Sequence, residues 1–172
     1  MFTVSRMKIG IALGSNLGDR LANLRAGRDA LLRLPGVTGE ARSSRVYETE
    51  PVGSGADAGA FLNAVVEVDF EGQAMTLLDG LQSIEAAMGR PSKRPRNAPR
   101  TLDLDILYVG NIALSNDEIA IPHPRLHQRR FVLTPLHDIR PDLLLPGQQK
   151  TVADLLAALA DPAAVELFAA EW

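Results

Sequence analysis

The sequence has 172 residues, 46% hydrophobic and 23% charged, a balance typical of one globular domain with its own core. It contains no cysteine, which excludes disulfides and thiolate metal sites. No apolar run approaches the ~20 residues of a membrane span, and no signal-peptide pattern opens the chain. Without such segments, we expect a cytoplasmic protein that does not bind membranes. The net charge of −3 gives no general affinity for nucleic acid, so we expect no nucleic-acid partner.

Hydrophobic spacing predicts alternating strands and helices in the first two thirds of the chain. Residues 8–13 form an apolar run that ends in turn residues, which indicates a strand. Leucines at helical spacing follow and stop at Pro35 and Gly36. The next predicted elements are a strand at 37–49, a strand at 61–70, a helix with an apolar stripe from 77 to 88, and a strand at 101–109.

The order strand, helix, strand, strand, helix, strand is typical of the ferredoxin-like βαββαβ fold. We therefore predict an α+β sandwich with an antiparallel sheet, forming a single domain over residues 1–172 with residues 1–6 as a loose leader. C-terminal additions follow the fourth strand. They are a helix at 125–136 with a turn at Pro135, and a helix at 151–159 that Thr151 and Asp154 begin as a capping box.

Two aspartates lie two residues apart in the last strand of this pattern, in the stretch PRTLDLDIL. Because side chains alternate along a strand, Asp103 and Asp105 share one face, with their Cα atoms about 6.5 to 7 Å apart. The apolar residues Leu102, Leu104 and Ile106 then face a core. Such a pair suits Mg²⁺, which takes one or two carboxylates together with substrate phosphates. The alternative is a pair of solvated acids bound to nearby arginines.

A basic loop precedes these aspartates. Residues 90–100 carry five cations and no acid, and three prolines exclude a helix. Cations beside metal carboxylates form a site for a polyphosphate. A solvated surface or a nucleic-acid patch is the alternative, although no aromatic residue is present for base stacking. The chain has neither a P-loop nor a Rossmann fingerprint, so a bound nucleotide needs another scaffold.

Three further positions have two interpretations each. His123, between two prolines, could donate to a phosphate or be a structural turn residue. Asn63 interrupts an apolar strand, and its amide could read a heterocycle edge or be satisfied by the backbone. Phe61 and Phe131 are more often core residues than ligand contacts.

Several stretches together resemble the 6-hydroxymethyl-7,8-dihydropterin pyrophosphokinase family of folate biosynthesis. They are IALGSNLGDR, SSRVYETEPVG, FLNAVVEV, IEAAMGR, APRTLDLDIL and IPHPRLHQRRFVLTPL. The resemblance implies transfer of the β,γ-pyrophosphoryl group of ATP to the pterin hydroxymethyl, with release of AMP and use of two Mg²⁺ ions. The alternatives are an ADP-forming small-molecule kinase and a non-catalytic ferredoxin-like binding module.

The resemblance also assigns roles to individual residues. It implies that Asp103 and Asp105 bind metal, and that Arg90 and Arg100 act with them in catalysis. The residues implied to bind ATP are Gln82, Glu85, Arg90, Ile106, His123 and Arg129. The residues implied to bind the pterin are Thr49, Val52, Phe61, Asn63, Arg100 and Phe131. The loops at 53–60 and 91–99 correspond to mobile lids, the partners are two small molecules, and we expect a monomer.

Overall fold

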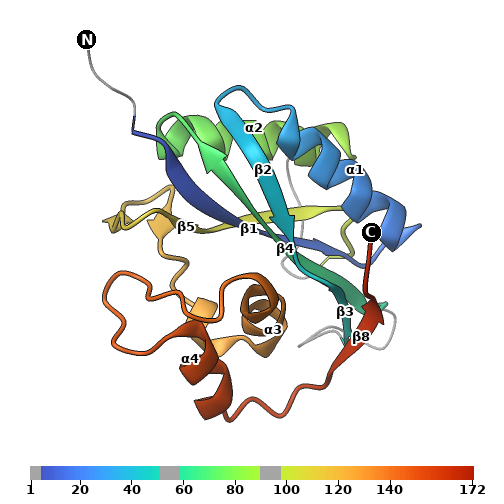
Figure 1. The fold of residues 1–172 in the computed structure, drawn as a ribbon. Helices are drawn as coiled ribbons and strands as arrows, with labels where there is room; N and C mark the ends of the chain where they lie inside the picture. Colours follow the sequence, from blue (N-terminus) through green and yellow to red (C-terminus); the bar gives the residue numbers. More distant parts are fainter. Residues whose placement is uncertain (1–4, 51–58, 90–97) are drawn as a thin grey trace.

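One antiparallel sheet organises the chain, and helices lie on both of its faces (Figure 1). The computed structural model describes residues 5–50, 59–89 and 98–172. Within these residues the sheet has six strands. They are β1 (Met7–Ser15), β2 (Val37–Ser43), β3 (Val46–Thr49), β4 (Phe61–Phe70), β5 (Asp103–Val109) and β8 (Val165–Ala169). The helices are α1 (Arg20–Leu32), α2 (Ala74–Ala87), α3 (Arg130–Ile139) and α4 (Val152–Ala158), with a 3₁₀ turn η1 (Leu126–Gln128) and a small hairpin of β6 (Leu114–Ser115) and β7 (Ala120–Ile121).

The strand order confirms the predicted ferredoxin-like arrangement. The order is β5-β1-β4-β3-β8, with β2 also pairing with β4. Because β1 occupies one edge of β4 over the whole strand, β2 and β3 share its other edge in succession. All pairings are antiparallel, and α1 and α2 are the two crossover helices of the βαββαβ unit.

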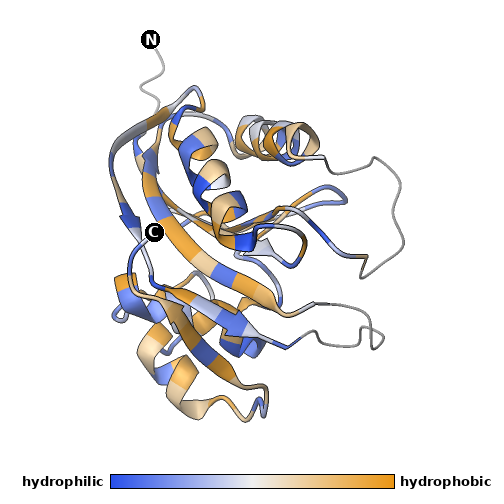
Figure 2. Cartoon of the chain, turned by 90° about the vertical axis from the view of Figure 1, so that its right-hand side faces the viewer, coloured by the Kyte–Doolittle hydropathy of each residue, from blue (hydrophilic) through white to orange (hydrophobic). Residues whose placement is uncertain are grey.

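Two hydrophobic clusters lie on opposite faces of the sheet. Leu24 and Leu31 of α1 and Leu77, Leu81 and Ile84 of α2 pack on one face. The other face is covered by α3 and α4 and by the chain between them. Figure 2 shows orange, the hydrophobic colour, along the central strands and on the helix sides that face them. Strand β4 supplies both clusters because its alternate residues point to opposite faces.

A buried polar network ties the α3 face together. The Tyr108 hydroxyl donates to Glu67 at 2.5 Å, and the Arg140 guanidinium at the end of α3 donates to the same carboxylate oxygen. The Tyr108 ring reaches Glu67 across Gly10, where a Cβ would lie 2.3 Å from a ring carbon. Position 10 therefore has to be glycine, since any side chain would displace the ring.

The structure corrects three boundaries expected from the sequence. The strand predicted at 37–49 is two strands, because the chain leaves the ladder at Ser44, whose hydroxyl accepts from Val65 N–H. The helix predicted at 125–136 starts later, and Pro135, predicted as a turn, lies inside α3. Pro135 is buried with Leu133 and Leu136, and this packing offsets the lost backbone hydrogen bond.

The C-terminal segment is partly as predicted. Helix α4 begins with the expected capping box of Thr151 and Asp154. The residues after it form β8, a sheet strand that the sequence pattern did not predict. At the other terminus, Arg6 of the expected leader is ion-paired with Asp69, and residues 1–4 lie outside the described residues. No helix in the described segments has the length and hydrophobicity of a membrane span.

Candidate active site

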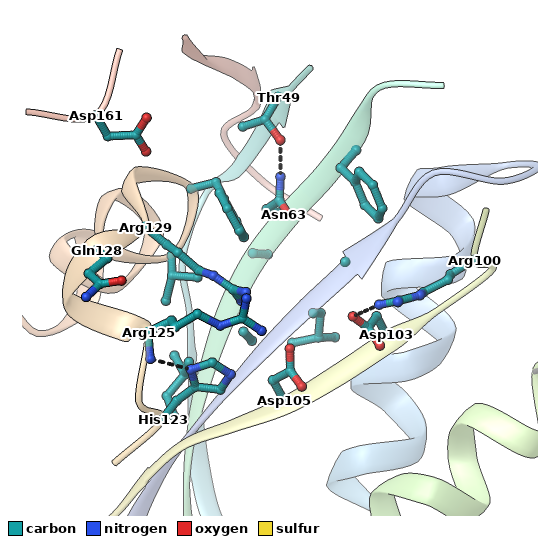
Figure 3. A pocket seen from close by; sticks show the side chains of 18 of the residues that line it. Thr49, Asn63, Arg100, Asp103, Asp105, His123, Arg125, Gln128, Arg129 and Asp161 are labelled. Carbon is teal, nitrogen blue, oxygen red and sulfur yellow. Dashed lines mark hydrogen bonds and ion pairs between the residues drawn. The ribbon is translucent and has the colours of Figure 1, made fainter. Parts of the chain in front are cut away.

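A cavity of about 480 Å³ opens on the α3 face of the sheet, where α3 leaves the ends of β1, β3, β4 and β5 uncovered (Figure 3). Strand and helix residues that lie far apart in the sequence, such as Ala12 on β1 and Val132 on α3, meet there. Its polar and charged lining side chains are Thr49, Glu50, Asn63, Arg100, Asp103, Asp105, His123, Arg125, Gln128, Arg129 and Asp161.

Asp103 and Asp105 form the acidic side of the cavity. Both are half-buried and line it, whereas Leu102, Leu104 and Ile106 are buried in the cluster under α1 and α2. The predicted alternation is therefore confirmed. Opposite the two aspartates on β1 stand Gly14 and Ala12, whose small size leaves open space beside the carboxylates.

Arg100 is fixed against this acidic side. Its guanidinium donates to Asp103 Oδ2 at 2.7 Å. The backbone of Arg100 is also held, because its N–H donates to Asn16 Oδ1 at 2.6 Å and its carbonyl accepts from Asn16 N–H at 3.0 Å. Arg100 thus enters the cavity from a backbone that is anchored to the end of β1.

Three cationic or potentially cationic side chains, from His123, Arg125 and Arg129, form the opposite side. They come from the turn that leads through η1 into α3, and in Figure 3 they point toward Asp105. His123 N–H donates to the Leu107 carbonyl at 2.9 Å, which ties this turn to β5. Arg125 N–H donates to His123 Nδ1 at 3.1 Å. Since Nδ1 accepts, a neutral His123 carries its proton on Nε2.

Burial lowers the pKa of His123 from its ordinary 6.5 to about 4, and the charges of Arg129 and Arg125 add to this effect. Burial also lowers the pKa of Arg129, with Arg125 adding to the effect, while Asp105 and Asp103 oppose it. At neutral pH His123 is therefore a neutral hydrogen-bond donor. The concentration of positive charge on this side suits a polyanion.

The depressed pKa of His123 predicts a pH dependence of stability. As pH falls from about 6.5 to 4, unfolded chains take up a proton at position 123 that folded chains do not, so the free energy of unfolding falls. Between pH 7 and pH 5 the loss is about 1 kcal/mol after allowance for partial solvent exposure. Denaturant unfolding at both pH values measures this loss. In His123→Gln the free energy of unfolding should fall by about 1 kcal/mol less than in the wild type. An equal loss in both proteins would contradict the prediction.

The third part of the cavity is a polar pair within apolar walls. Asn63 Nδ2 donates to Thr49 Oγ1 at 2.9 Å, and both residues are buried. Phe61 lies on the same strand as Asn63, and Phe131 reaches the cavity from α3. Asn63 Oδ1 faces Gly14, where an added Cβ would lie 3.7 Å away. A flat heterocycle could hydrogen-bond to Asn63 and lie between aromatic rings.

Most of the predicted site residues meet in this cavity, but not all. Thr49, Phe61, Asn63, Arg100, Asp103, Asp105, His123, Arg129 and Phe131 line it. Gln82 is exposed on α2, and Ile106 is in the core. Glu85 is buried and accepts from Leu104 N–H at 2.7 Å, so it joins α2 to β5. The predicted roles of Arg90 and Val52 and the two predicted lids fall on residues 90–97 and 51–58, outside the described residues, apart from the lid ends.

The structure adds lining residues that the sequence pattern did not single out. Arg125 could have been suspected, because it follows His123 by two residues in a rigid turn. Gln128 follows from the 3₁₀ turn that only the structure shows. Asp161 lies in the chain after α4, and no local signal marks it.

A ferredoxin-like domain in which a carboxylate pair faces clustered cations defines a candidate enzyme acting on a polyphosphate substrate. Residues 10–141 match the family model described as 7,8-dihydro-6-hydroxymethylpterin-pyrophosphokinase (HPPK), and the chain belongs to this family. The match covers every described lining residue of the cavity except Asp161.

Individual relatives agree with the family assignment. The chain is 41% identical over 156 residues to the 2-amino-4-hydroxy-6-hydroxymethyldihydropteridine pyrophosphokinase of Methylorubrum extorquens, covering 91% of this chain and 95% of that protein. It is 40% identical over 157 residues to the enzyme of the same name from Haemophilus influenzae, covering 91% and 96%. Among solved structures, wild-type Plasmodium falciparum HPPK-DHPS with pteroate has a TM-score of 0.68 at 15% identity, covering 89% of this chain and 42% of that chain. At this identity the structural match supports the fold.

Proposed function

We propose that this chain transfers the pyrophosphoryl group of ATP to 6-hydroxymethyl-7,8-dihydropterin and releases AMP, a step of folate biosynthesis. Membership of the HPPK family supports the reaction. The observation that assigns this reaction to particular residues is the set of side chains that line one cavity. Its carboxylate pair, its cations and its buried Asn63–Thr49 pair are the groups that a triphosphate and a pterin edge require.

We propose that Asp103 and Asp105 hold two Mg²⁺ ions on the acidic side of this cavity. Asp103 and Asp105 offer only oxygen ligands, and within the described part of the chain no cluster of three or more acids or histidines is present. Mg²⁺ characteristically binds through one or two carboxylates and completes its shell with phosphates and water. Bound there, the ions would neutralise triphosphate charge and lower the pKa of the attacking hydroxyl.

Other side chains of the cavity bind the triphosphate and stabilise the charge that develops during transfer. His123 and Arg129 hold the triphosphate from the α3 side, His123 as a neutral donor through Nε2. Arg100, anchored to Asn16, stabilises charge on the transferred phosphates, and its contact with Asp103 places it beside the metal ligands. The pterin oxygen attacks the β-phosphorus in line with the departing AMP, and the cavity walls keep water away.

Asn63 fixes the pterin by its polar edge. Asn63→Leu keeps the side-chain size and removes the amide, which leaves the polar pterin edge unpaired on binding. We expect KM for the pterin to rise roughly a hundredfold, with KM for ATP changed by less than about threefold. Steady-state kinetics with each substrate varied in turn measure both. An equal rise in KM for ATP and for the pterin would mean that Asn63 maintains the fold and does not recognise the pterin.

Product analysis tests the reaction. The protein is mixed with MgATP, with and without 6-hydroxymethyl-7,8-dihydropterin, and the nucleotides are separated by chromatography. AMP that forms only with the pterin supports the proposal. ADP would identify an ordinary kinase, and no nucleotide change with folded protein would favour a binding module. We further propose a cytoplasmic monomer, for which light scattering should give a mass near 18.5 kDa.

A further inference from the structure

The chain between α4 and β8 is tied to the first turn of α3 by reciprocal contacts. The Arg130 guanidinium donates to the Leu159 carbonyl at 2.9 Å and to the Asp161 carbonyl at 3.2 Å. In return, Asp161 Oδ2 accepts from Arg130 N–H at 3.3 Å. The other carboxylate oxygen of Asp161 accepts from Ala163 N–H at 2.9 Å, which fixes its orientation.

The first N–H group of helix α3, that of Arg130, has its acceptor in Asp161. The first N–H groups of a helix have no partner within the helix and are normally satisfied by the side chain of the N-cap residue. The N-cap of α3 is Arg129, whose side chain makes no capping hydrogen bond. A carboxylate near a helix N-terminus is also favoured by the helix dipole. Asp161 thus replaces the missing cap from a distance of 31 residues.

The contact between Asp161 and Arg130 lies next to two residues of the cavity. Arg130 stands between Arg129 and Phe131, which line the cavity on its phosphate and pterin sides respectively. Fixing the backbone of position 130 therefore fixes both neighbours. The same C-terminal segment continues into β8, where Val165 pairs with Thr49, the hydrogen-bond partner of Asn63. All of these tail residues lie beyond the family match at 10–141.

We propose that Asp161 is a positioning residue that caps α3 from the C-terminal tail and so aligns Arg129 with the triphosphate and Phe131 with the pterin. This inference rests on the proposed function. Position 161 supplies two acceptor oxygens, one for Arg130 N–H and one for Ala163 N–H. An asparagine keeps one acceptor oxygen and puts an NH2 donor in the place of the other, so it should replace aspartate only in part.

Two variants and two kinetic constants test the proposal in the full-length protein. Loss of a helix cap changes the equilibrium between the formed and the frayed helix end roughly three- to thirtyfold. We expect Asp161→Ala to raise KM for both ATP and the pterin by a factor in this range, with kcat within about threefold of wild type. Asp161→Asn, which keeps one of the two acceptor oxygens, should give KM values between those of wild type and those of Asp161→Ala. A purely structural loss would instead reduce the active fraction, lowering kcat at unchanged KM.

The sole tryptophan reports whether the tail stays docked. Trp172 donates through Nε1 to the Ser44 carbonyl at 2.7 Å and stacks on Arg28. Its emission should be the same in wild type, Asp161→Ala and Asp161→Asn, so that altered KM cannot be assigned to a detached tail. Unchanged KM values in Asp161→Ala would overturn the proposal, as would KM values in Asp161→Asn that are no lower than those in Asp161→Ala. Wild-type protein that forms no AMP would instead refute the proposed function.

Discussion

Asp105→Ala should lose nearly all pyrophosphoryl transfer while the protein remains folded. Asp105 lines the cavity on the face opposite the core, so its removal leaves no hole among packed apolar side chains. Its loss halves the carboxylate pair that would hold metal against the triphosphate. We expect turnover to fall roughly a thousandfold, as when a group that stabilises transition-state charge is removed. AMP formation followed by chromatography measures the loss, and circular dichroism reports the fold.

The control for this experiment is another aspartate in the same protein. Asp79 is exposed on α2 and does not line the cavity, so Asp79→Ala should retain wild-type turnover. Calorimetric titration of Mg²⁺ with a non-hydrolysable ATP analogue should show weaker binding for Asp105→Ala and unchanged binding for Asp79→Ala. An unfolded Asp105→Ala protein would mean that Asp105 is a structural residue, and the proposed metal site would be wrong.

Arg100→Ala should lower kcat by roughly a hundredfold or more and change KM less. The backbone of Arg100 is anchored at both its N–H and its carbonyl by Asn16, which presents the guanidinium to the acidic side of the cavity. A rigidly presented charge is suited to stabilising the developing charge on transferred phosphates. Steady-state kinetics with both substrates separate the two constants. A rise in KM alone would mean that Arg100 binds substrate and transition state equally.

Arg100→Lys and Arg25→Ala complete this test. Lysine keeps the charge but loses the forked geometry, so it should recover only part of kcat. Arg25 is exposed on α1 and outside the cavity, and its replacement by alanine should leave the kinetics unchanged. Recovery of full activity by lysine would show that charge alone matters at position 100.

The sequence pattern located the elements better than their ends. Strand β4 was predicted with its observed bounds because a ten-residue run rich in β-branched residues has no competing interpretation. Pro135 misled the prediction of α3, since burial of its neighbours outweighs the local preference of proline to end a helix. Strand β8 was missed because its short segment forms a strand only by pairing with β3.

The sequence by itself determined the ferredoxin-like order of elements, the family, and the shared face of Asp103 and Asp105. These depend on local periodicity and on contiguous motifs, which a single chain displays directly. Only the tertiary structure decided which distant residues complete the cavity. It brought Arg125 and Gln128 into the same cavity lining as the aspartates, and it separated Gln82, Glu85 and Ile106 from the described lining. It also placed Asp161 at the start of α3, because a helix cap can come from any segment that packing brings near, and no local pattern records that contact.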